Sequence, residues 1–558
     1  MLCRFRWPTA FSAAASVVAA LLVVNQSHAQ QPGYDVLIRN GRVLDGTGNP
    51  WFSGDVAVRN GRIAAIGRLS GATAARVIDA TNLVVAPGFI DLHTHTELLG
   101  NPTAQSKVRE GVTLDVMGEG GSVAPRDPNP AQGGGGRGGR GNRNGANWTN
   151  FTEYFDLLEK QGISMNIISH VAYGTIRSLV MHYDDGPPSP EQLAQMKQLM
   201  TQSMEEGAWG LVTDFDSGGP NHPEQVIELA KIASAHGGNY NSHIGSEGFQ
   251  QEKEIAFVVR LAREANIPAH IFHFKIRAEE NWGTIGNYIA QIEEARAEGL
   301  DITANQYPYT AMFHGWGTFF PLWMRQGGRF AERLKDPANR QKIKDDPDFK
   351  TWSKEHGGWD GIVLARVNTE ANKKYEGMRV SQIAKLRGDA DPADTCISLM
   401  AEEGGNISGI FHTMSEADVQ KVMKLSWVSI ASDGSAIDLT ASGVPHPRNY
   451  STNPRVLGHY VRDGKTLTLE DAVRKMTSLP AQILGIPDRG QIHEGFAADI
   501  TIFDPAKVKE TNSFESPKSY PEGIPYVLVN GVLVIDKGEH TGATPGRVLR
   551  GHGYKKPA

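Results

Sequence analysis

Phe89-Ile90-Asp91-Leu92-His93-Thr94-His95 is a short apolar run that ends in two histidines separated by one residue. Alternate residues of a β-strand lie on the same face, so His93 and His95 are expected to point in one direction. Enzymes built on a barrel of parallel strands carry their reactive groups at the carboxyl ends of those strands. This run therefore predicts a strand that delivers two imidazoles to the mouth of such a barrel.

The pattern of an apolar strand followed by a polar helix repeats along the chain. Helical stretches such as 223–235 and 255–265 separate several of the candidate strands. The eight candidates cover residues 83–95, 112–118, 165–173, 210–215, 238–243, 269–275, 302–309 and 428–433. Alternating β and α units favour a parallel sheet, and eight units predict an α/β fold of the (β/α)₈ barrel type over residues 87–484.

Both ends of the chain have a different sequence pattern, with short predicted strands around Asn-Gly pairs. Asn40-Gly41, Asn60-Gly61 and Asn530-Gly531 each lie between apolar residues that alternate with polar ones. This is a strong hairpin signal, because both turn positions need a positive φ. Residues 30–86 and 485–558 are therefore predicted to form one small β-sandwich beside the barrel.

The first 29 residues have the composition of a secretory signal peptide. Arg4 and Arg6 precede an apolar stretch over residues 10–24, and Ser27-His28-Ala29 has the small-x-small pattern of a cleavage site. The apolar stretch is shorter than the about 20 residues that span a bilayer, which argues against a membrane anchor. The expected location is outside the cytoplasm, either secreted or periplasmic.

Two segments interrupt the barrel pattern. A Gly-rich loop is predicted at 131–147, because residues 133–145 are all Gly, Arg or Asn and offer nothing to bury. No aromatic residues are interleaved with its arginines and the formal net charge of the chain is −6, so nucleic acid is not an expected partner. The second segment, about 313–409, is too long for an ordinary loop and is predicted to form a lid.

Further histidines and acids fall at or near the carboxyl ends of the later candidate strands. With the pair on the first strand, the candidate metal ligands are His93, His95, Glu119, His243, His273 and Asp433. Nitrogen and oxygen donors of this kind suit Zn²⁺, and their number allows one or two ions, with another divalent metal as an alternative.

Not every histidine is interpreted in this way. A single histidine on an apolar strand is more often a hydrogen-bonded core group than a ligand. That interpretation is given to His170, His236, His270 and His314.

The same donors indicate hydrolytic chemistry. Zinc lowers the pKa of a coordinated water to about 7 and polarises a carbonyl group. A carboxylate must take the proton from this water and pass it to the departing amine. Asp433 is the candidate, because it can contact both the metal and the water. The sequence therefore predicts a metal-dependent hydrolase of amide bonds.

Motifs spread over nearly the whole mature chain share one resemblance. They include residues 85–95, Asn281-Trp282-Gly283, Gln306-Tyr307-Pro308-Tyr309, His446-Pro447-Arg448 and Pro454-Arg455-Val456-Leu457-Gly458. The first resembles the strand-one signature of the amidohydrolase superfamily, and the others are similar to its D-aminoacylase (N-acyl-D-amino-acid deacylase) branch. The resemblance implies a barrel with a small β-sandwich and zinc-dependent removal of the acyl group from an N-acyl-D-amino acid.

The resemblance also implies roles for individual residues. In the branch, the histidines of strands five and six hold a tight zinc together with a strand-two thiolate, which assigns that role to His243 and His273. The strand-one histidines and the strand-eight aspartate, here Asp433, form a weaker site or serve catalysis. Lys275 and Tyr307 correspond to residues that bind the substrate carboxylate.

The chain departs from the branch at two points. Glu119 stands where a cysteine is common, and residues 209–215 contain no lysine for a carbamylated bridge, so Glu119 is the expected bridge between two ions. The arginine that often follows the strand-five histidine is absent from residues 243–247. Arg448 is the candidate for this missing substrate-binding charge.

Two other functions are compatible with the sequence. One is a different amidohydrolase activity, on a dipeptide, a cyclic amide or a lactone. The other is a non-catalytic binding protein on the same barrel, which predicts that metal ligands have been lost. Here the expected positions, apart from the thiolate, carry their usual residue types, and the expected partner is a small N-acylated amino acid or related amide.

Overall fold

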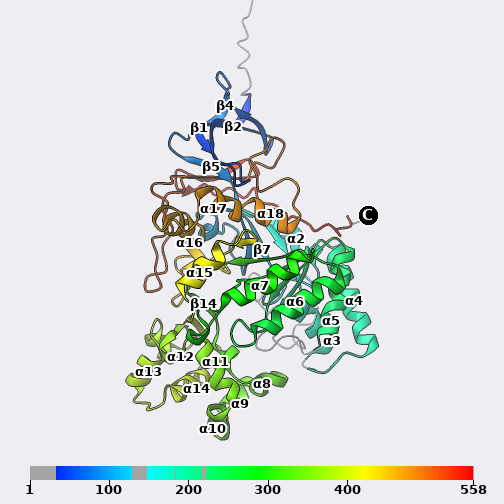
Figure 1. The fold of residues 1–558 in the computed structure, drawn as a ribbon, viewed down its shortest axis with the longest axis vertical. Helices are drawn as coiled ribbons and strands as arrows, with labels where there is room; N and C mark the ends of the chain where they lie inside the picture. Colours follow the sequence, from blue (N-terminus) through cyan, green and yellow to red (C-terminus); the bar gives the residue numbers. More distant parts are fainter. Residues whose placement is uncertain (1–32, 128–146, 183, 216–221, 557–558) are drawn as a thin grey trace, which may run out of the picture.

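The computed structural model describes residues 33–127, 147–182, 184–215 and 222–556. The predicted signal peptide lies outside this part of the chain. So do residues 131–146 of the predicted Gly-rich loop 131–147. Figure 1 shows three layers from top to bottom: a sheet built from the chain ends, a body of strands and helices, and a helical lobe. None of the helices in the described part combines the length and apolar character needed to span a bilayer.

Strands from both chain ends share one nine-stranded sheet. Its hydrogen-bonded order is β21-β20-β19-β18-β5-β1-β2-β3, with β4 paired to β1. The members are β1 (Tyr34–Val43), β2 (Phe52–Arg59), β3 (Arg62–Gly67), β4 (Ala74–Asp79), β5 (Val84–Pro87), β18 (Ile500–Phe503), β19 (Tyr526–Val529), β20 (Val532–Asp536) and β21 (Glu539–His540). Two distant segments of the sequence therefore build one β-layer.

The Asn-Gly pairs have two different roles in this sheet. Asn60 and Asn530 have φ values of 52° and 48° and form the tight turns between β2 and β3 and between β19 and β20, as predicted. The prediction of a turn at Asn40-Gly41 is wrong, because both residues lie inside β1 at a shift in its register with β2. A β-bulge also accommodates a positive φ, so the Asn-Gly pattern does not distinguish it from a hairpin turn.

The parallel strands of the body form two sheets, ordered β6-β7-β8 and β9-β10-β11-β12-β13-β17. Only His170 separates β8 from β9, and at the other side Thr94 and Gly434 form a parallel bridge. The members are β6 (Phe89–Thr94), β7 (Val112–Met117), β8 (Asn166–Ser169), β9 (Val171–Ala172), β10 (Gly210–Asp214), β11 (Asn239–His243), β12 (Ala269–Ile271), β13 (Ile302–Gln306) and β17 (Val428–Ile430). All eight predicted strand regions contain a strand, and the predicted α/β fold is confirmed.

The predicted strand 83–95 is divided at Gly88. Before this residue β5 belongs to the sheet of the chain ends, and after it β6 begins the body. A Cβ atom at Gly88 would lie 2.2 Å from Thr113 Oγ1, closer than non-bonded atoms approach. Glycine is therefore required where the chain passes from one part of the fold to the other.

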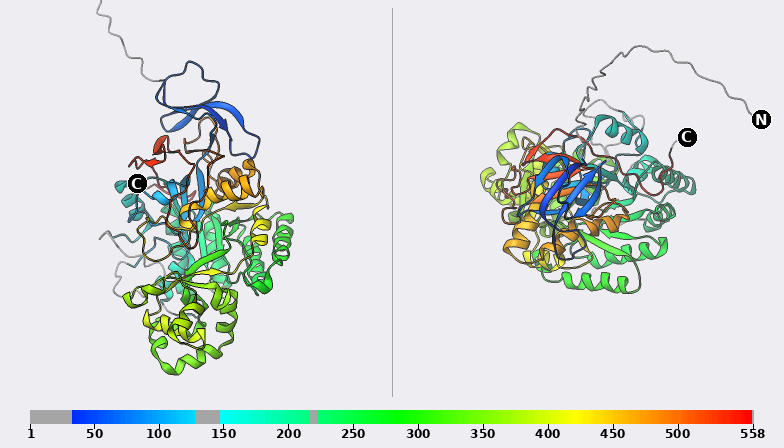
Figure 2. Two further views of the ribbon diagram at one scale, coloured as in Figure 1. Left: turned by 90° about the vertical axis from the view of Figure 1, so that its left-hand side faces the viewer. Right: turned by 90° about the horizontal axis from the view of Figure 1, so that it is seen from above.

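Helices pack against the outer faces of these strands, and in the view from above in Figure 2 they lie around the periphery. They are α1 (Gln105–Val108), α2 (Phe151–Gln161), α3 (Tyr173–Met181), α4 (Pro190–Glu205), α5 (Pro223–Ala235), α6 (Gln251–Ala265), α7 (Ile285–Ala297), α15 (Glu416–Met423), α16 (Arg448–Arg455), α17 (Leu469–Met476) and α18 (Ser478–Leu484). On α6, Ile255, Val258 and Leu261 recur at helical spacing and are all buried. The helix–strand alternation read from the sequence thus reflects one apolar face per helix.

The predicted insertion forms a lobe at the bottom of Figure 1, at the end of the body away from β1 and β2. An antiparallel sheet, ordered β14-β16-β15, connects it to the body, and Trp316, Phe319 and Phe411 lie in its own buried cluster. Its elements are β14 (Ala311–Gly315), α8 (Leu322–Arg325), α9 (Phe330–Lys335), α10 (Pro337–Asp345), α11 (Pro347–Glu355), α12 (Gly358–Gly361), β15 (Ile362–Arg366), α13 (Val380–Arg387), α14 (Pro392–Glu402) and β16 (Ser408–His412). A lid function for this lobe stays a prediction.

Candidate metal centre

All six predicted metal ligands lie together at the carboxyl ends of the parallel strands. His93 is near the end of β6, His95 directly follows this strand and His243 ends β11. Glu119, His273 and Asp433 follow β7, β12 and β17 by two or three residues. A cavity of about 930 Å³ lies between these ligands and the insertion, which contributes Phe313, His314 and Arg366 to its lining.

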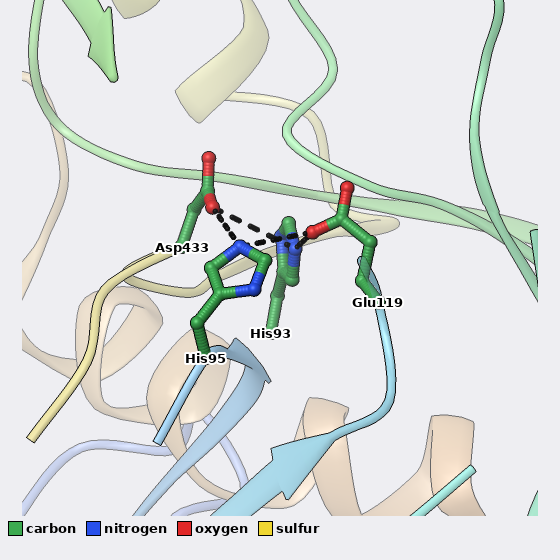
Figure 3. Close-up of side chains that lie close together, drawn as sticks. All are labelled: His93, His95, Glu119 and Asp433. Carbon is green, nitrogen blue, oxygen red and sulfur yellow. Dashed lines mark hydrogen bonds and ion pairs between the residues drawn. The ribbon is translucent and has the colours of Figure 1, made fainter. Parts of the chain in front are cut away.

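The donor atoms form two clusters that share Glu119. The first contains His93, His95, Glu119 and Asp433, and the second contains Glu119, His243 and His273. Within each cluster, one ligand atom from every residue lies within 4.8 Å of the others. In Figure 3 the carboxylates of Asp433 and Glu119 flank the two imidazoles of the first cluster. A carboxylate common to both clusters is in the position of a bridge between two ions.

The distances within the clusters fit metal coordination. His95 Nε2 lies 3.0 Å from Asp433 Oδ1 and 3.1 Å from Glu119 Oε2, and Glu119 Oε2 also contacts His93 Nε2. Glu119 Oε1 lies 2.6 Å from His243 Nδ1, and His273 Nε2 is 3.6 Å away. Two donors about 2.1 Å from a tetrahedral zinc ion are about 3.4 Å apart. The donor set and its spacing therefore fit a divalent cation after small adjustments.

Charge at the centre is governed by the two carboxylates. Burial alone raises the pKa of Glu119, but the imidazoles of His93, His243 and His273 lower it well below its usual value. Burial also opposes protonation of His95, yet Asp433 and Glu119 raise the pKa of this imidazole to about 9. The carboxylates thus stabilise positive charge between them, whether it is carried by protons or by a metal ion.

Asp433 is held as an ionised group by its surroundings. Burial raises the pKa of this carboxyl, but Arg448, His93 and the hydrogen bond from His95 together lower it far below its ordinary value. Arg448 Nη1 lies 2.8 Å from Asp433 Oδ2, whereas Oδ1 faces the first cluster. One carboxylate oxygen is therefore fixed by a cation while the other is directed at the reacting centre.

A buried network connects β6 to the segment after β17. Lys107 Nζ donates to Asp91 Oδ2 at 2.8 Å and to Ser432 Oγ at 2.5 Å, and Asp91 Oδ1 accepts from the Ser432 backbone N–H at 2.9 Å. Asp91 lies two residues before His93, and Ser432 directly precedes Asp433. The network therefore fixes the relative position of two ligands that are distant in the sequence.

The three predicted substrate-binding residues are close to the clusters. Lys275 and Arg448 line the cavity, and Tyr307 is buried beside both, with the Lys275 Nζ 5.4 Å and the Arg448 guanidinium 4.8 Å from its ring centre. Lys275 and Arg448 already contact Glu247 and Asp433, respectively. Their roles toward a substrate stay predictions.

Two acids near the second cluster were not selected from the sequence. Glu247 is buried and its Oε1 lies 2.7 Å from His273 Nδ1, where it orients the ring and fixes which nitrogen faces the cluster. Asp214 ends β10, and its Oδ1 is 4.0 Å from His243 Nδ1. The rule that selected Asp433, an acid at the carboxyl end of a strand, also applies to Asp214. Glu247 lies in a loop, where periodicity gives no signal.

The histidines interpreted as core groups differ in their surroundings. His236 is only partly buried, directly after α5, and hydrogen-bonds the backbone of that helix. His170 and His270 are buried and hydrogen-bonded, to Asn239 and to Thr303, which confirms that interpretation. His314 lies instead at the wall of the cavity. His314 lies on β14, which belongs to the insertion. The apolar residues beside it in the sequence therefore do not place it in the core of the body.

Comparison with known families identifies a match over more than half of the chain. The model of the amidohydrolase family matches residues 76–321 and 425–535. This chain belongs to the amidohydrolase family. The two matched segments contain all six candidate ligands of this amidohydrolase, whereas most of the insertion lies between them.

Individual relatives cover nearly the whole amidohydrolase. D-aminoacylase of Alcaligenes xylosoxydans xylosoxydans is 33% identical over 94% of this chain and 99% of its own. A crystal structure of N-acyl-D-glutamate deacylase from Bordetella bronchiseptica, complexed with zinc and a phosphonate inhibitor, has a TM-score of 0.78 and 27% identity over 93% of this chain and 99% of its own. A D-aminoacylase structure from work on its binuclear metal centre has a TM-score of 0.75 and 30% identity, with coverages of 93% and 100%. The predicted resemblance to the D-aminoacylase branch is confirmed.

Proposed function

We propose that this amidohydrolase removes the acyl group from N-acyl-D-amino acids, with zinc held by the two clusters. The observation that carries the proposal is the convergence of four imidazoles and two carboxylates, with Glu119 shared, beneath one cavity. The names of its relatives, D-aminoacylase and N-acyl-D-glutamate deacylase, support the substrate class.

The residues have distinct tasks in this reaction. When bound, a divalent cation such as zinc acidifies a water and polarises the amide carbonyl. Asp433 is ionised, so its Oδ1 accepts a proton from water and then delivers it to the departing amine. Arg448 holds the opposite oxygen and thereby fixes the direction of this transfer. Phe272 stacks on His93 with ring centres 4.0 Å apart, which limits rotation of that imidazole.

Three finer features belong to the same proposal. The two parallel sheets form one closed (β/α)₈ barrel, which is supported by the bridge between Thr94 and Gly434 and by the short step from β8 to β9. The sheet of the chain ends is a small β-sandwich, and the protein is exported to the periplasm or secreted. Export is supported by the composition of residues 1–29.

A substrate panel tests the proposed activity. The purified protein with zinc is assayed on N-acetyl-D-amino acids, their L-enantiomers, dipeptides, cyclic imides and lactones. The expected result is acetate release from the D-compounds, loss of turnover after chelation and recovery with zinc. Turnover of only the cyclic compounds or dipeptides would contradict the assignment, and metal-loaded protein that hydrolyses none of them would favour a binding protein.

A further inference from the structure

A second, smaller hollow, here named the small pocket, lies beside the first metal cluster. It has a volume of about 40 Å³, and His95 and Glu119, two ligands of that cluster, line both this pocket and the large cavity. Lys275 and Arg448 line the large cavity but not the small pocket. The metal centre is therefore in contact with two spaces that differ in size and in the charge of their walls.

The walls of the small pocket are largely apolar. They include Met117 at the end of β7, Val123, Trp148 and, on α2, Tyr154. Trp148 Nε1 donates to the Val123 carbonyl oxygen at 2.7 Å, and the centres of the Trp148 and Tyr154 rings lie 5.2 Å apart. The Arg126 guanidinium lies 4.1 Å from the Trp148 ring centre. These contacts fix the aromatic side of the pocket before a ligand binds.

The hydroxyl groups that line the small pocket are engaged within the protein. Their protons are donated to a backbone carbonyl oxygen or to a buried carboxylate: Thr94 Oγ1 to Val116 at 3.2 Å, Thr96 Oγ1 to Asp115 Oδ2 at 2.7 Å and Ser122 Oγ to Ala124 at 2.6 Å. A buried water needs roughly two to four polar partners, whereas an apolar cavity accepts apolar ligands. The small pocket therefore suits an apolar group better than a charged one.

The small pocket has room for a short chain. About 10–15 Å³ of space holds one water-sized group, so 40 Å³ holds about three such groups. Gly118 lines the pocket where the chain leaves β7; its φ is 140°, and a Cβ there would lie 2.9 Å from the His170 carbonyl oxygen. Glu119 follows directly, so a backbone shift that widened the pocket on this side would move a metal ligand.

We propose that the small pocket receives the acyl group of the substrate, while the amino-acid part lies in the large cavity. An amide is planar and almost always trans, so the groups at its two ends point away from each other. When the carbonyl lies at the metal centre and the amino acid extends toward Lys275 and Arg448, the acyl chain extends away from them. This inference rests on the proposed deacylase function and deepens it: the acyl group is apolar and carries about three carbons at most beyond the carbonyl.

The large cavity is the alternative place for the acyl group, because its volume of about 930 Å³ has room for both parts of the substrate. Two methionines separate the alternatives. Met117 lines the small pocket and not the large cavity, whereas Met312 of β14 lines the large cavity and not the small pocket. Both side chains are buried, so an alanine at either position removes the same atoms from comparable surroundings.

A series of acyl groups tests this inference on the zinc-loaded full-length protein. The kcat/KM values are measured on the N-acetyl, N-butyryl and N-hexanoyl derivatives of one D-amino acid, the one whose N-acetyl form is hydrolysed fastest. Wild type should hydrolyse the hexanoyl compound at least about 10-fold less efficiently than the acetyl compound, since one misfitting methylene already changes kcat/KM by about 10-fold or more. Met117→Ala should raise the hexanoyl-to-acetyl ratio at least about 10-fold, and Met312→Ala should leave it unchanged.

The ratio of two substrates is measured on one protein preparation, so a loss of stability or of active fraction does not change it. Trp148→Phe opens the same pocket at a partly buried position and should raise the ratio in the same direction, which decides the question if Met117→Ala does not fold.

The outcomes distinguish the inference from the proposed function. A ratio that rises in Met117→Ala or Trp148→Phe and not in Met312→Ala supports the acyl pocket. Equal wild-type values for the three acyl groups, a ratio that stays constant in every folded pocket variant, or an equal rise in Met312→Ala overturns the inference while the deacylase function stands. Wild-type protein that hydrolyses no N-acyl-D-amino acid overturns both.

Discussion

Asp433→Asn tests the assigned proton transfer with little disturbance of the backbone. Asp433 has a φ of 51°, in the left-handed region that Asn tolerates as well as Asp. The amide cannot serve as the base, and general acid–base groups contribute about 10²- to 10⁴-fold to rate. We expect kcat for deacylation to fall at least about 100-fold, because Asp433 Oδ1 contacts the first cluster and the other acid of that cluster, Glu119, is shared with the second cluster.

The same substitution has a calculable effect on stability. Both Asp433 oxygens face donors, His95 Nε2 at 3.0 Å and Arg448 Nη1 at 2.8 Å, so the Asn amide group must point its NH₂ toward one of them. Removing one partner of a buried ion pair costs about 3–5 kcal/mol. Asp433→Ala should be less stable still, since a left-handed conformation costs about 1–2 kcal/mol without Asn or Gly.

Zinc-loaded variants are compared by kcat and by denaturant unfolding, with Asp438→Asn as the matched control. Asp438 lines the cavity but is exposed and belongs to neither cluster, so its amide variant should keep normal turnover. Asp433→Asn protein that is folded and loaded, yet retains more than a tenth of wild-type kcat, would refute the assignment of Asp433 as the base.

Three further predictions concern the metal, the chain crossing and pH. Glu119→Gln should lower zinc content at both clusters, because one carboxylate serves both; mass spectrometry that finds full loading would show that Glu119 is not a bridge. Gly88→Ala should destabilise the protein by about 1–3 kcal/mol in chemical denaturation, since its Cβ would overlap Thr113, and an unchanged midpoint would contradict this. Burial lowers the pKa of His170 to about 4, so the unfolded chain, with a pKa of about 6.5, binds more protons and stability is lost as pH falls from about 6.5 toward 4. Between pH 7.5 and 5 this residue should cost about 2 kcal/mol; with chelator present, His170→Gln should flatten that part of the unfolding curve, and parallel curves would count against it.

The sequence predicted the site better than its surroundings because the ligands follow strands. An apolar run that ends in His93 and His95 carries both its secondary structure and its direction, and His243 and Asp433 end or follow similar runs. Glu247 was missed because it lies in a loop, where burial arises from tertiary packing alone. The prediction for Lys275 followed a resemblance, and its ion pair with Glu247 is visible only in the coordinates.

The boundaries of the fold were less predictable than its elements. Residues 83–95 have the sequence pattern of a single strand, and their division at Gly88 depends on the close approach of Thr113, which is 25 residues away. Asn40-Gly41 has the local preferences of a turn, yet β5 and β2 pair with β1 on either side and turn it into a bulge. In both cases a contact distant in sequence decides the local conformation.

The most direct test of the shared metal centre is anomalous diffraction at the zinc edge from crystals of the zinc-loaded protein. The account predicts a peak within about 2.5 Å of a Glu119 carboxylate oxygen and of the ring nitrogens of His243 and His273. A second peak between Glu119 and Asp433 is expected at higher zinc concentration. Peaks only elsewhere, or none within reach of Glu119 in loaded protein, would contradict the central claim.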